Sequence, residues 1–335
     1  MNDQEFEVEF LQKFNSFLST SYFASTYKLV FLKSLLKLAD YQNSNPKSVI
    51  GHKWIQQNGT TLIVDLNFIA VPFTKYYWDM FYKFRLRQSQ TKNQYGDDDL
   101  NIHKNFKDEN GIAKKPPKTA DELASDEYDS LRKKIIERSI RKEVLDHLSS
   151  SGFYKKAKGK SYIIMDSRVI RFFEKYRIIL DSAINYKITK YLEGINKYFP
   201  QVAKAVLIDI PRQPLPKKER EEYDKLYTNS DLFTCFYCEN EFPLNKHTRD
   251  HAIPFDYVLS ENLYNSVPSC QTCNSKKSNL LPDTHIFEEI IKRNKTLTNL
   301  TDYSEKEFRK LYGNCKQSYH GNRRYFKFQY LTSQN

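Results

Sequence analysis

Two Cys-x-x-Cys pairs constrain what this chain can fold into more than any other feature of its sequence. Cys235 and Cys238 form the first pair, Cys270 and Cys273 form the second, and the fifth cysteine is Cys315. In a reducing compartment such pairs serve as metal ligands more often than they form disulfides. Two pairs together supply the four thiolates of a tetrahedral Zn²⁺ site with no open position. The sequence therefore predicts a structural zinc.

A redox role explains the cysteines less well than a metal does. Thioredoxin-like chemistry needs one pair in a strand-to-helix context and leaves the second pair unexplained. We expect residues 239–269, between the pairs, to bury little apolar material. We therefore expect metal binding to supply much of the folding free energy of this region.

The charge of the chain favours a polyanionic partner. Its 335 residues carry a formal net charge of +12, and Lys and Arg are interleaved with Tyr, Phe and Asn over most of the length. A positive field of this kind attracts nucleic acid. The alternative is that the composition reflects an AT-rich genome, whose proteins are rich in Lys, Asn, Ile and Tyr, so charge alone leaves the partner open.

No segment of the sequence has the character of a membrane span. None reaches the run of about 18 uncharged apolar residues that a span needs. The start, "MNDQEFEVEF", is acidic and unlike a signal peptide. We therefore expect a cytoplasmic protein without a membrane partner.

The length of the chain and its 39% hydrophobic content allow two packed domains. Apolar residues recur at helical spacing in several long segments of the N-terminal part, and Asn58-Gly59 between two strand-like runs predicts a hairpin. We expect a mainly helical DNA- or partner-binding region over residues 1–210, with a polar loop at about 88–118. A proline-rich linker is expected over 211–222, and a second domain over 223–330.

A closed zinc cage accounts for the cysteines but leaves other residues of the same region unexplained. The order Cys-x-x-Cys, "DHAIP", "NSVPSC" and "CNSKK", over residues 235–282, resembles the HNH endonucleases. The resemblance implies a ββα-metal fold, two strands and a helix around a divalent ion, braced in many members by a four-cysteine zinc. The expected fold is thus multidomain, with a mainly α N-terminal region and a small α+β HNH domain at the C-terminus.

The resemblance also implies roles for single residues. His251 matches the general base, a group that takes a proton from water near neutral pH. Asp250 and Asn274 match the ligands of a catalytic ion, and their oxygens suit Mg²⁺ or Mn²⁺. Asn265 matches the residue that braces the loop that aims the histidine. Asn262 competes for that role, although the distance to the second cysteine pair favours Asn265.

Basic residues near the end of the chain are candidates for phosphate contacts. Lys276 and Lys277 follow the second cysteine pair, and the alternative is a solvated helix face. Arg323 and Arg324 lie in "YHGNRRYFKFQY", which could follow a nucleic-acid backbone or form an ordinary closing strand.

The sequence as a whole predicts a metal-dependent DNA endonuclease. In "STYKLVFLKSLL" and "YYW" the N-terminal region also resembles the helical domains that precede HNH modules in some bacterial restriction or defence proteins. This resemblance favours a role in restriction or antiphage defence. Duplex DNA is the expected substrate, and a homodimer or a companion methyltransferase or ATPase would be consistent with that role. Two alternatives remain open, namely a zinc-braced nucleic-acid-binding module without catalysis and an RNA-directed nuclease or toxin.

Overall fold

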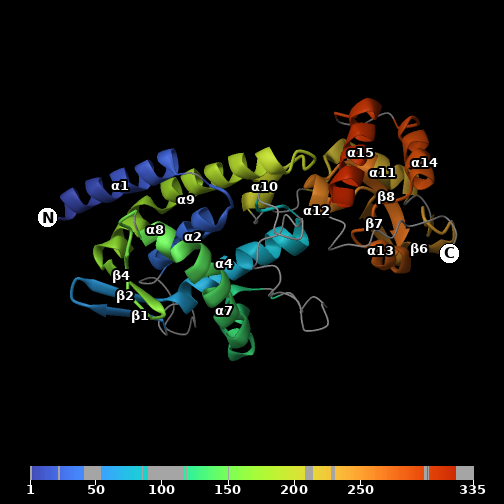
Figure 1. The fold of residues 1–335 in the computed structure, drawn as a ribbon. Helices are drawn as coiled ribbons and strands as arrows, with labels where there is room; N and C mark the ends of the chain where they lie inside the picture. The colour runs from blue at the N-terminus through green and yellow to red at the C-terminus, as the bar shows by residue number, and fades with distance from the viewer. Residues whose placement is uncertain are drawn as a thin grey trace. The chain divides into compact units, whose positions relative to one another are not determined.

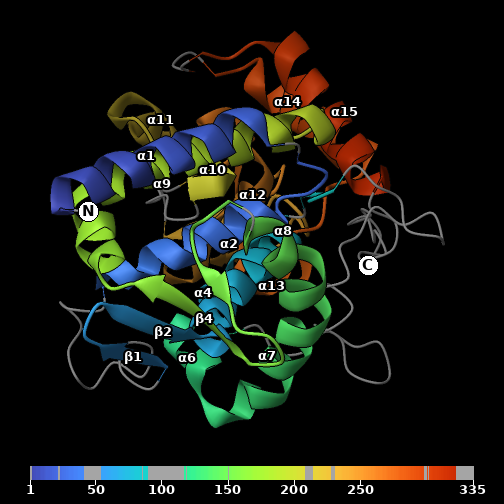
Figure 2. The same cartoon turned by 60° about the vertical axis from the view of Figure 1, so that its left-hand side comes forward.

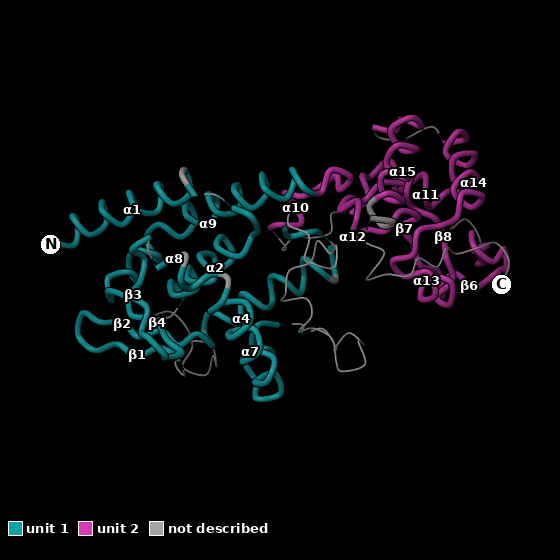
Figure 3. The backbone as a smooth tube through the Cα atoms, in the orientation of Figure 1, with its two compact units in different colours: residues 1–195 teal, residues 196–335 magenta. Residues whose placement is uncertain are grey.

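Helices form most of the chain that the structure describes, in agreement with the helical periodicity of the sequence (Figure 1). The computed structural model describes residues 2–321 except 22, 41–53, 85, 90–116, 118, 150, 208–213, 228–230, 298–299 and 301. The polar loop expected at about 88–118 falls almost entirely outside these residues. The chain divides into two compact units, unit 1 with residues 1–195 and unit 2 with residues 196–335 (Figure 3).

Unit 1 is a helical unit whose long helices α1 and α9 lie side by side in both views (Figure 1, Figure 2). Its helices, including the short 3₁₀ turns η1 and η3 and the π-helical segments η2 and η4, are α1 (Asp3–Thr20), α2 (Tyr27–Leu35), η1 (Leu36–Asp40), α4 (Leu66–Trp78), η2 (Asp79–Lys83), α6 (Ala120–Ala124), η3 (Asp126–Tyr128), α7 (Asp129–Ile135), η4 (Ile136–Leu145), α8 (Asp146–Ser149) and α9 (Arg168–Ile195).

Local sequence explains where the first helix begins. The Asn2 side chain accepts a hydrogen bond from the Glu5 backbone N–H, and the Glu5 carboxylate accepts one from the Asn2 N–H, both at 2.8 Å. This capping box satisfies two backbone donors that a helix N-terminus leaves open.

A four-stranded antiparallel sheet completes unit 1. Its strands are β1 (Ile55–Asn58), β2 (Thr61–Asp65), β3 (Lys155–Lys156) and β4 (Tyr162–Asp166), in the spatial order β1-β2-β4-β3. The hairpin predicted at Asn58-Gly59 is confirmed, and Gly59 has the positive φ of 58° that a tight turn requires. The sequence predicts the hairpin alone, whereas the pairing of β2 with β4 joins two distant segments into one sheet.

Aromatic rings hold α1 on unit 1. The Phe10 ring lies 4.8 Å from that of Phe172 on α9 and 5.6 Å from that of Phe153, measured between centroids. All three side chains are buried. Apolar contact of this kind, rather than the salt bridges at the surface of α1, supplies the main attachment of the helix.

Replacing Phe10 by Ala should lower the free energy of unfolding of unit 1 by roughly 3–5 kcal/mol, because a buried ring is lost and a cavity remains. The only two tryptophans of the chain, Trp54 and Trp78, lie in unit 1, so tryptophan fluorescence during urea unfolding follows this unit. Val8→Ala on the same helix is the matched control, since Val8 is 50% exposed. Equal losses in the two variants would contradict this assignment of the core.

Unit 2 combines short strands with six helices in its described residues. The strands are β5 (Leu232–Thr234), β6 (Glu241–Pro243), β7 (His247–His251) and β8 (Ser266–Cys270), and the helices, with the 3₁₀ turns η5 and η6, are α10 (Val202–Leu207), α11 (Lys217–Tyr227), η5 (Leu244–Lys246), α12 (Phe255–Val258), η6 (Leu263–Asn265), α13 (Gln271–Lys277), α14 (Thr284–Asn294) and α15 (Glu305–Gly321). β5 pairs with β6 and β7 with β8, each pair antiparallel.

Part of the predicted linker is instead a packed helix. Residues 214–216 are irregular, but Lys217–Tyr227 forms α11 within unit 2. Glu219 of this helix is fully buried, and its carboxylate accepts a hydrogen bond from the Leu263 N–H at 2.7 Å. The charged sequence suggested a linker, since composition does not reveal that the Glu219 carboxylate is buried and hydrogen-bonded.

No helix in the described ranges combines the length with the apolar character that crossing a membrane requires.

Candidate active site and metal centre

The pairing of β7 with β8 brings together the residues that the sequence singled out. His247 lies opposite Cys270, and His251 lies opposite Ser266. β8 leads directly into α13, which carries Cys273 in its first turn. The two strands and the helix implied by the resemblance are therefore β7, β8 and α13.

The four paired cysteines converge on one point. Their sulfur atoms all lie within 4.8 Å of one another, and they belong to Cys235, Cys238, Cys270 and Cys273. Zinc–sulfur bonds of about 2.3 Å in a tetrahedron separate the sulfurs by about 3.8 Å, so a small contraction closes the cage around an ion. The four residues fit a closed four-thiolate metal site, as the spacing of the pairs predicts.

Backbone N–H groups support two of these thiolates. The Cys270 N–H donates to the Cys235 sulfur at 3.3 Å, and the Cys273 N–H donates to the Cys270 sulfur at 3.4 Å. Burial alone would raise the pKa of Cys235, but N–H donors from three residues, including Cys270 and Cys238, lower it to about 7. The thiolate form, which binds metal, is thereby favoured at this position.

Aromatic side chains cover the cysteine centre. Phe233 is buried beside Cys235 and Cys270, and Phe242 and Tyr237 pack against the same cluster. Water is thus kept away from the buried sulfurs, as expected for a site whose role is structural.

His251 is held by a carboxylate that the sequence analysis did not single out. Its Nε2 lies 3.0 Å from Oε2 of Glu261, and the same oxygen accepts a hydrogen bond from the Arg249 guanidinium at 3.0 Å. The imidazole packs against the Phe255 ring at 5.3 Å between centroids. The side chains of His251 and Glu261 are only 10% and 4% exposed. Nε2 of His251 therefore makes its hydrogen bond inside the protein. Nδ1 is the second nitrogen of the ring.

Asp250 faces the opposite side of β7, because successive side chains of a strand alternate. Its Oδ2 accepts a hydrogen bond from the Tyr237 hydroxyl and lies 3.0 Å from Nζ of Lys277. Burial, together with the neighbouring Asp250 carboxylate, raises the pKa of Tyr237 well above its usual value, so the phenol remains a donor. Tyr237 lies between the first two cysteines, and the cysteine centre is thus connected to Asp250 by one hydrogen bond.

Lys277 corrects one prediction. The sequence suggests a phosphate contact, but Lys277 is fully buried, and its Nζ also donates to the His251 carbonyl oxygen at 2.5 Å. Burial lowers the pKa of Lys277, and the Asp250 carboxylate opposes that shift. Charge and position on a helix suggested a surface residue, whereas its partner Asp250 draws the ammonium group inward. Lys276, the preceding residue, is exposed.

Asn265 braces the chain just after His251. Its side-chain oxygen accepts a hydrogen bond from the Ile253 N–H at 2.8 Å, and its amide donates to the Ile253 carbonyl at 2.9 Å. The competing candidate, Asn262, instead donates to the Ser260 hydroxyl. Asn265 therefore holds the backbone that follows His251, and its role in aiming the histidine stays a prediction.

The oxygens proposed for a catalytic ion suit a hard divalent cation. Both contacts of the Asp250 carboxylate use Oδ2, so Oδ1 is the oxygen through which it could hold Mg²⁺ or Mn²⁺. Asn274 follows Cys273 on α13 and is half-buried. Because Lys277 already balances the Asp250 charge, such an ion would bind more weakly here than between two unpaired carboxylates. Arg323 and Arg324 lie outside the described residues.

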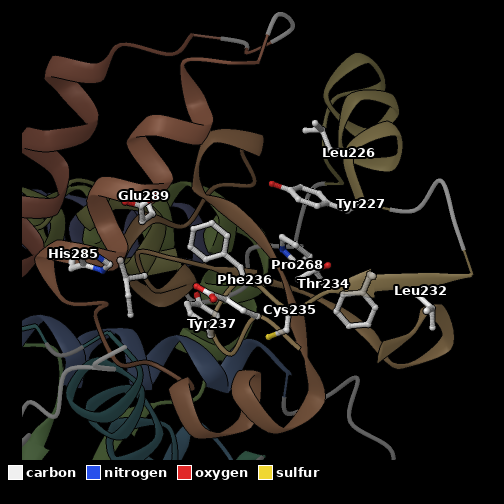
Figure 4. A pocket seen from close by; sticks show the side chains of 13 residues that line it. Leu226, Tyr227, Leu232, Thr234, Cys235, Phe236, Tyr237, Pro268, His285 and Glu289 are labelled. Carbon is white, nitrogen blue, oxygen red and sulfur yellow. The ribbon is translucent and has the colours of Figure 1, made fainter. Parts of the chain in front are cut away.

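A cavity of about 500 Å³ opens beside the first cysteine pair (Figure 4). Phe236 and Tyr227 form aromatic walls, and His285 and Glu289 of α14 lie on another side. Among the described residues that line the cavity none is Lys or Arg, so it does not suit a phosphate group. Tyr237 is shared, since it lines this cavity and also holds Asp250.

Three residues of the site were not predicted from the sequence, namely Glu261, Arg249 and Tyr237. The sequence signal for Tyr237 is its position just before Cys238. The signal for Arg249 is its spacing of two from His251, which puts both side chains on the same face of a strand. Nothing local marks Glu261, because only the folded loop brings it to β7.

Comparison with known proteins agrees with this geometry. Residues 235–280 match the family model described as HNH endonuclease, a segment that contains both cysteine pairs, β7, β8 and α13. No curated protein and no solved structure matches the chain. Unit 2 therefore contains an HNH endonuclease domain with four cysteines positioned to bind a metal, and an HNH domain indicates a nuclease that binds nucleic acid.

Cys270→Ser should remove most of the bound zinc and lower the melting temperature of unit 2, because three thiolates hold the ion less well than four. Metal content measured by inductively coupled plasma mass spectrometry tests this. Cys315→Ala is the matched control, since Cys315 lies on α15 outside the cluster. Equal zinc loss from both variants would contradict the assigned ligands.

Lys277→Met should destabilise unit 2 by about 3–5 kcal/mol, because the buried Asp250 carboxylate loses its charged partner. Lys276→Met, one residue earlier and exposed, should have little effect. Hydrogen–deuterium exchange of the β7 amides measures the difference. Unchanged protection in Lys277→Met would show that the ion pair does not support the hairpin.

Proposed function

We propose that this protein is a metal-dependent DNA endonuclease that hydrolyses phosphodiester bonds at the HNH domain of unit 2. One observation carries the proposal: a buried imidazole, His251, adjoins Asp250 on β7 beside a four-cysteine centre, in a segment that matches the HNH family. A module that only binds nucleic acid needs neither residue.

The chain's own residues divide the chemistry between them. His251 takes the proton from the attacking water, a role typically worth about 10²–10⁴ in rate. Asp250 and Asn274 would hold a Mg²⁺ or Mn²⁺ ion, which supplies charge stabilisation at the phosphate and the leaving oxygen. Asn265 keeps the following loop in place through Ile253. The cysteines and their zinc shape the site without taking part in the reaction.

Duplex DNA is the proposed substrate. The net charge of +12 supports a polyanion. In unit 1 the β3–β4 hairpin exposes four lysines, which are Lys155, Lys156, Lys158 and Lys160. Such side chains contact phosphates without reading sequence. A single site of this kind cuts one strand at a time. A role in restriction or antiphage defence is part of the proposal and rests on the resemblance of the N-terminal region alone.

One observation favours a second candidate. The Lys277 ammonium already compensates Asp250, which weakens the case for an ion there. A zinc-braced nucleic-acid-binding module without catalysis would tolerate this arrangement.

His251→Ala should abolish most nicking of supercoiled plasmid, because its imidazole is the proposed acceptor of the proton from water. The assay compares Mg²⁺, Mn²⁺ and EDTA at equal zinc content, with a labelled RNA as a second substrate. His285→Ala, a histidine on α14, is the control. Cutting that persists in EDTA or in His251→Ala would contradict the mechanism. Retardation of DNA in a gel without cutting, on unmodified and modified DNA, would support the binding module instead.

A further inference from the structure

We propose that Glu261 is a positioning residue for His251, whose Nε2 hydrogen it accepts, so that Nδ1 is the nitrogen that takes the proton from water. This inference deepens the proposed function and rests on it. In the resulting step the water oxygen forms the new P–O bond while its proton passes to Nδ1. The bond from phosphorus to the leaving oxygen breaks, and that oxygen is protonated from solvent.

The contact itself is close and enclosed. Oε2 of Glu261 lies 3.0 Å from Nε2 of His251, the usual distance of an N–H···O hydrogen bond. With the Glu261 side chain 4% exposed and that of His251 10% exposed, little water competes for either atom. A carboxylate can only accept at this position, so the hydrogen lies on Nε2 of the imidazole.

Arg249 keeps the carboxylate in place. It lies two residues before His251 on β7, so both side chains leave the same face of the strand. Its guanidinium donates to the same Oε2 at 3.0 Å. Glu261 is thereby held between two donors from one strand, and rotation of its side chain would break both contacts.

The loop that carries Glu261 is also anchored on both sides. Leu259, at the end of α12, has a left-handed backbone with φ 50° and ψ 33°, which turns the chain sharply. Its carbonyl accepts a hydrogen bond from Lys204 at 3.1 Å. On the other side, the Asn262 carbonyl accepts a hydrogen bond from the Ser266 hydroxyl at 2.8 Å. Because the loop is strained at Leu259 and anchored on both sides, it holds the Glu261 side chain in a fixed place.

Other roles for Glu261 fit the geometry less well. As the general base it would have to release two donors and reach water from a nearly enclosed position. As an ion ligand it would have to leave Arg249, its charged partner. Asp250, the proposed ligand, lies on the opposite face of β7, so Glu261 and Asp250 do not share one ion through this strand.

The test uses the full-length zinc-loaded protein and two variants, Glu261→Ala and Glu261→Gln. Glu261→Gln keeps the size of the side chain and remains informative if the alanine variant folds poorly. Glu241→Gln, an exposed residue on β6, is the control. Histidine-selective ¹⁵N labelling and NMR report which ring nitrogen carries hydrogen, and His251→Ala identifies the signal among the seven histidines. Steady-state cleavage of plasmid with Mg²⁺ gives kcat and KM for each protein.

In the wild type we expect hydrogen on Nε2 of His251 alone, and in both Glu261 variants a mixture of the two tautomers. The kcat should fall roughly 10–100-fold in both, the usual effect of losing a partner that orients a catalytic group, while KM stays within about twofold. A Nε2 hydrogen that persists in both variants, or a kcat equal to that of Glu241→Gln, would overturn the proposal. If the wild type does not cut any substrate, the nuclease proposal fails, and the tautomer signal still decides whether Glu261 orients the ring.

Discussion

The buried ion pair between Lys277 and Asp250 is the interaction on which the rest of the site depends. It joins α13 to β7 across the ββα unit, and the same ammonium also binds the His251 carbonyl. Two opposite charges without water are costly to bury unless each is compensated, which explains why the Tyr237 hydroxyl adds a third contact. Strand, helix and cysteine loop are thereby held in one arrangement.

The cysteine centre acts on the site through this pair. Cys235 and Cys238 flank Tyr237 in the same loop. Cys270 caps the N-terminus of α13, and this helix carries Cys273 and Asn274 and ends at Lys277. A metal bound by these thiolates would therefore fix both sides of Asp250 without touching the substrate. The expectation of little apolar material between the cysteine pairs is wrong, because Ile253, Leu263 and Val267 are fully buried there. Metal and apolar core therefore act together in placing the polar groups.

Much of the architecture could be predicted from local patterns. The long helix α9 and the Asn58-Gly59 hairpin follow from periodicity and turn chemistry, which act over neighbouring residues. The pairing of β2 with β4 and the helix within the proline-rich segment could not be predicted. Both depend on partners distant in sequence, such as the Leu263 N–H that accommodates the Glu219 carboxylate.

The sequence by itself identified the four cysteines, whose sulfur atoms lie within 4.8 Å of one another, and the adjacent Asp250 and His251, because residue type and spacing mark them. Only the tertiary structure decided what surrounds them. It turned Lys277 inward to Asp250 and brought Glu261 to His251. The physical reason is that the position of a charged side chain depends on the attraction of its partner and on the desolvation cost of burial. Both are set by segments that meet only after folding.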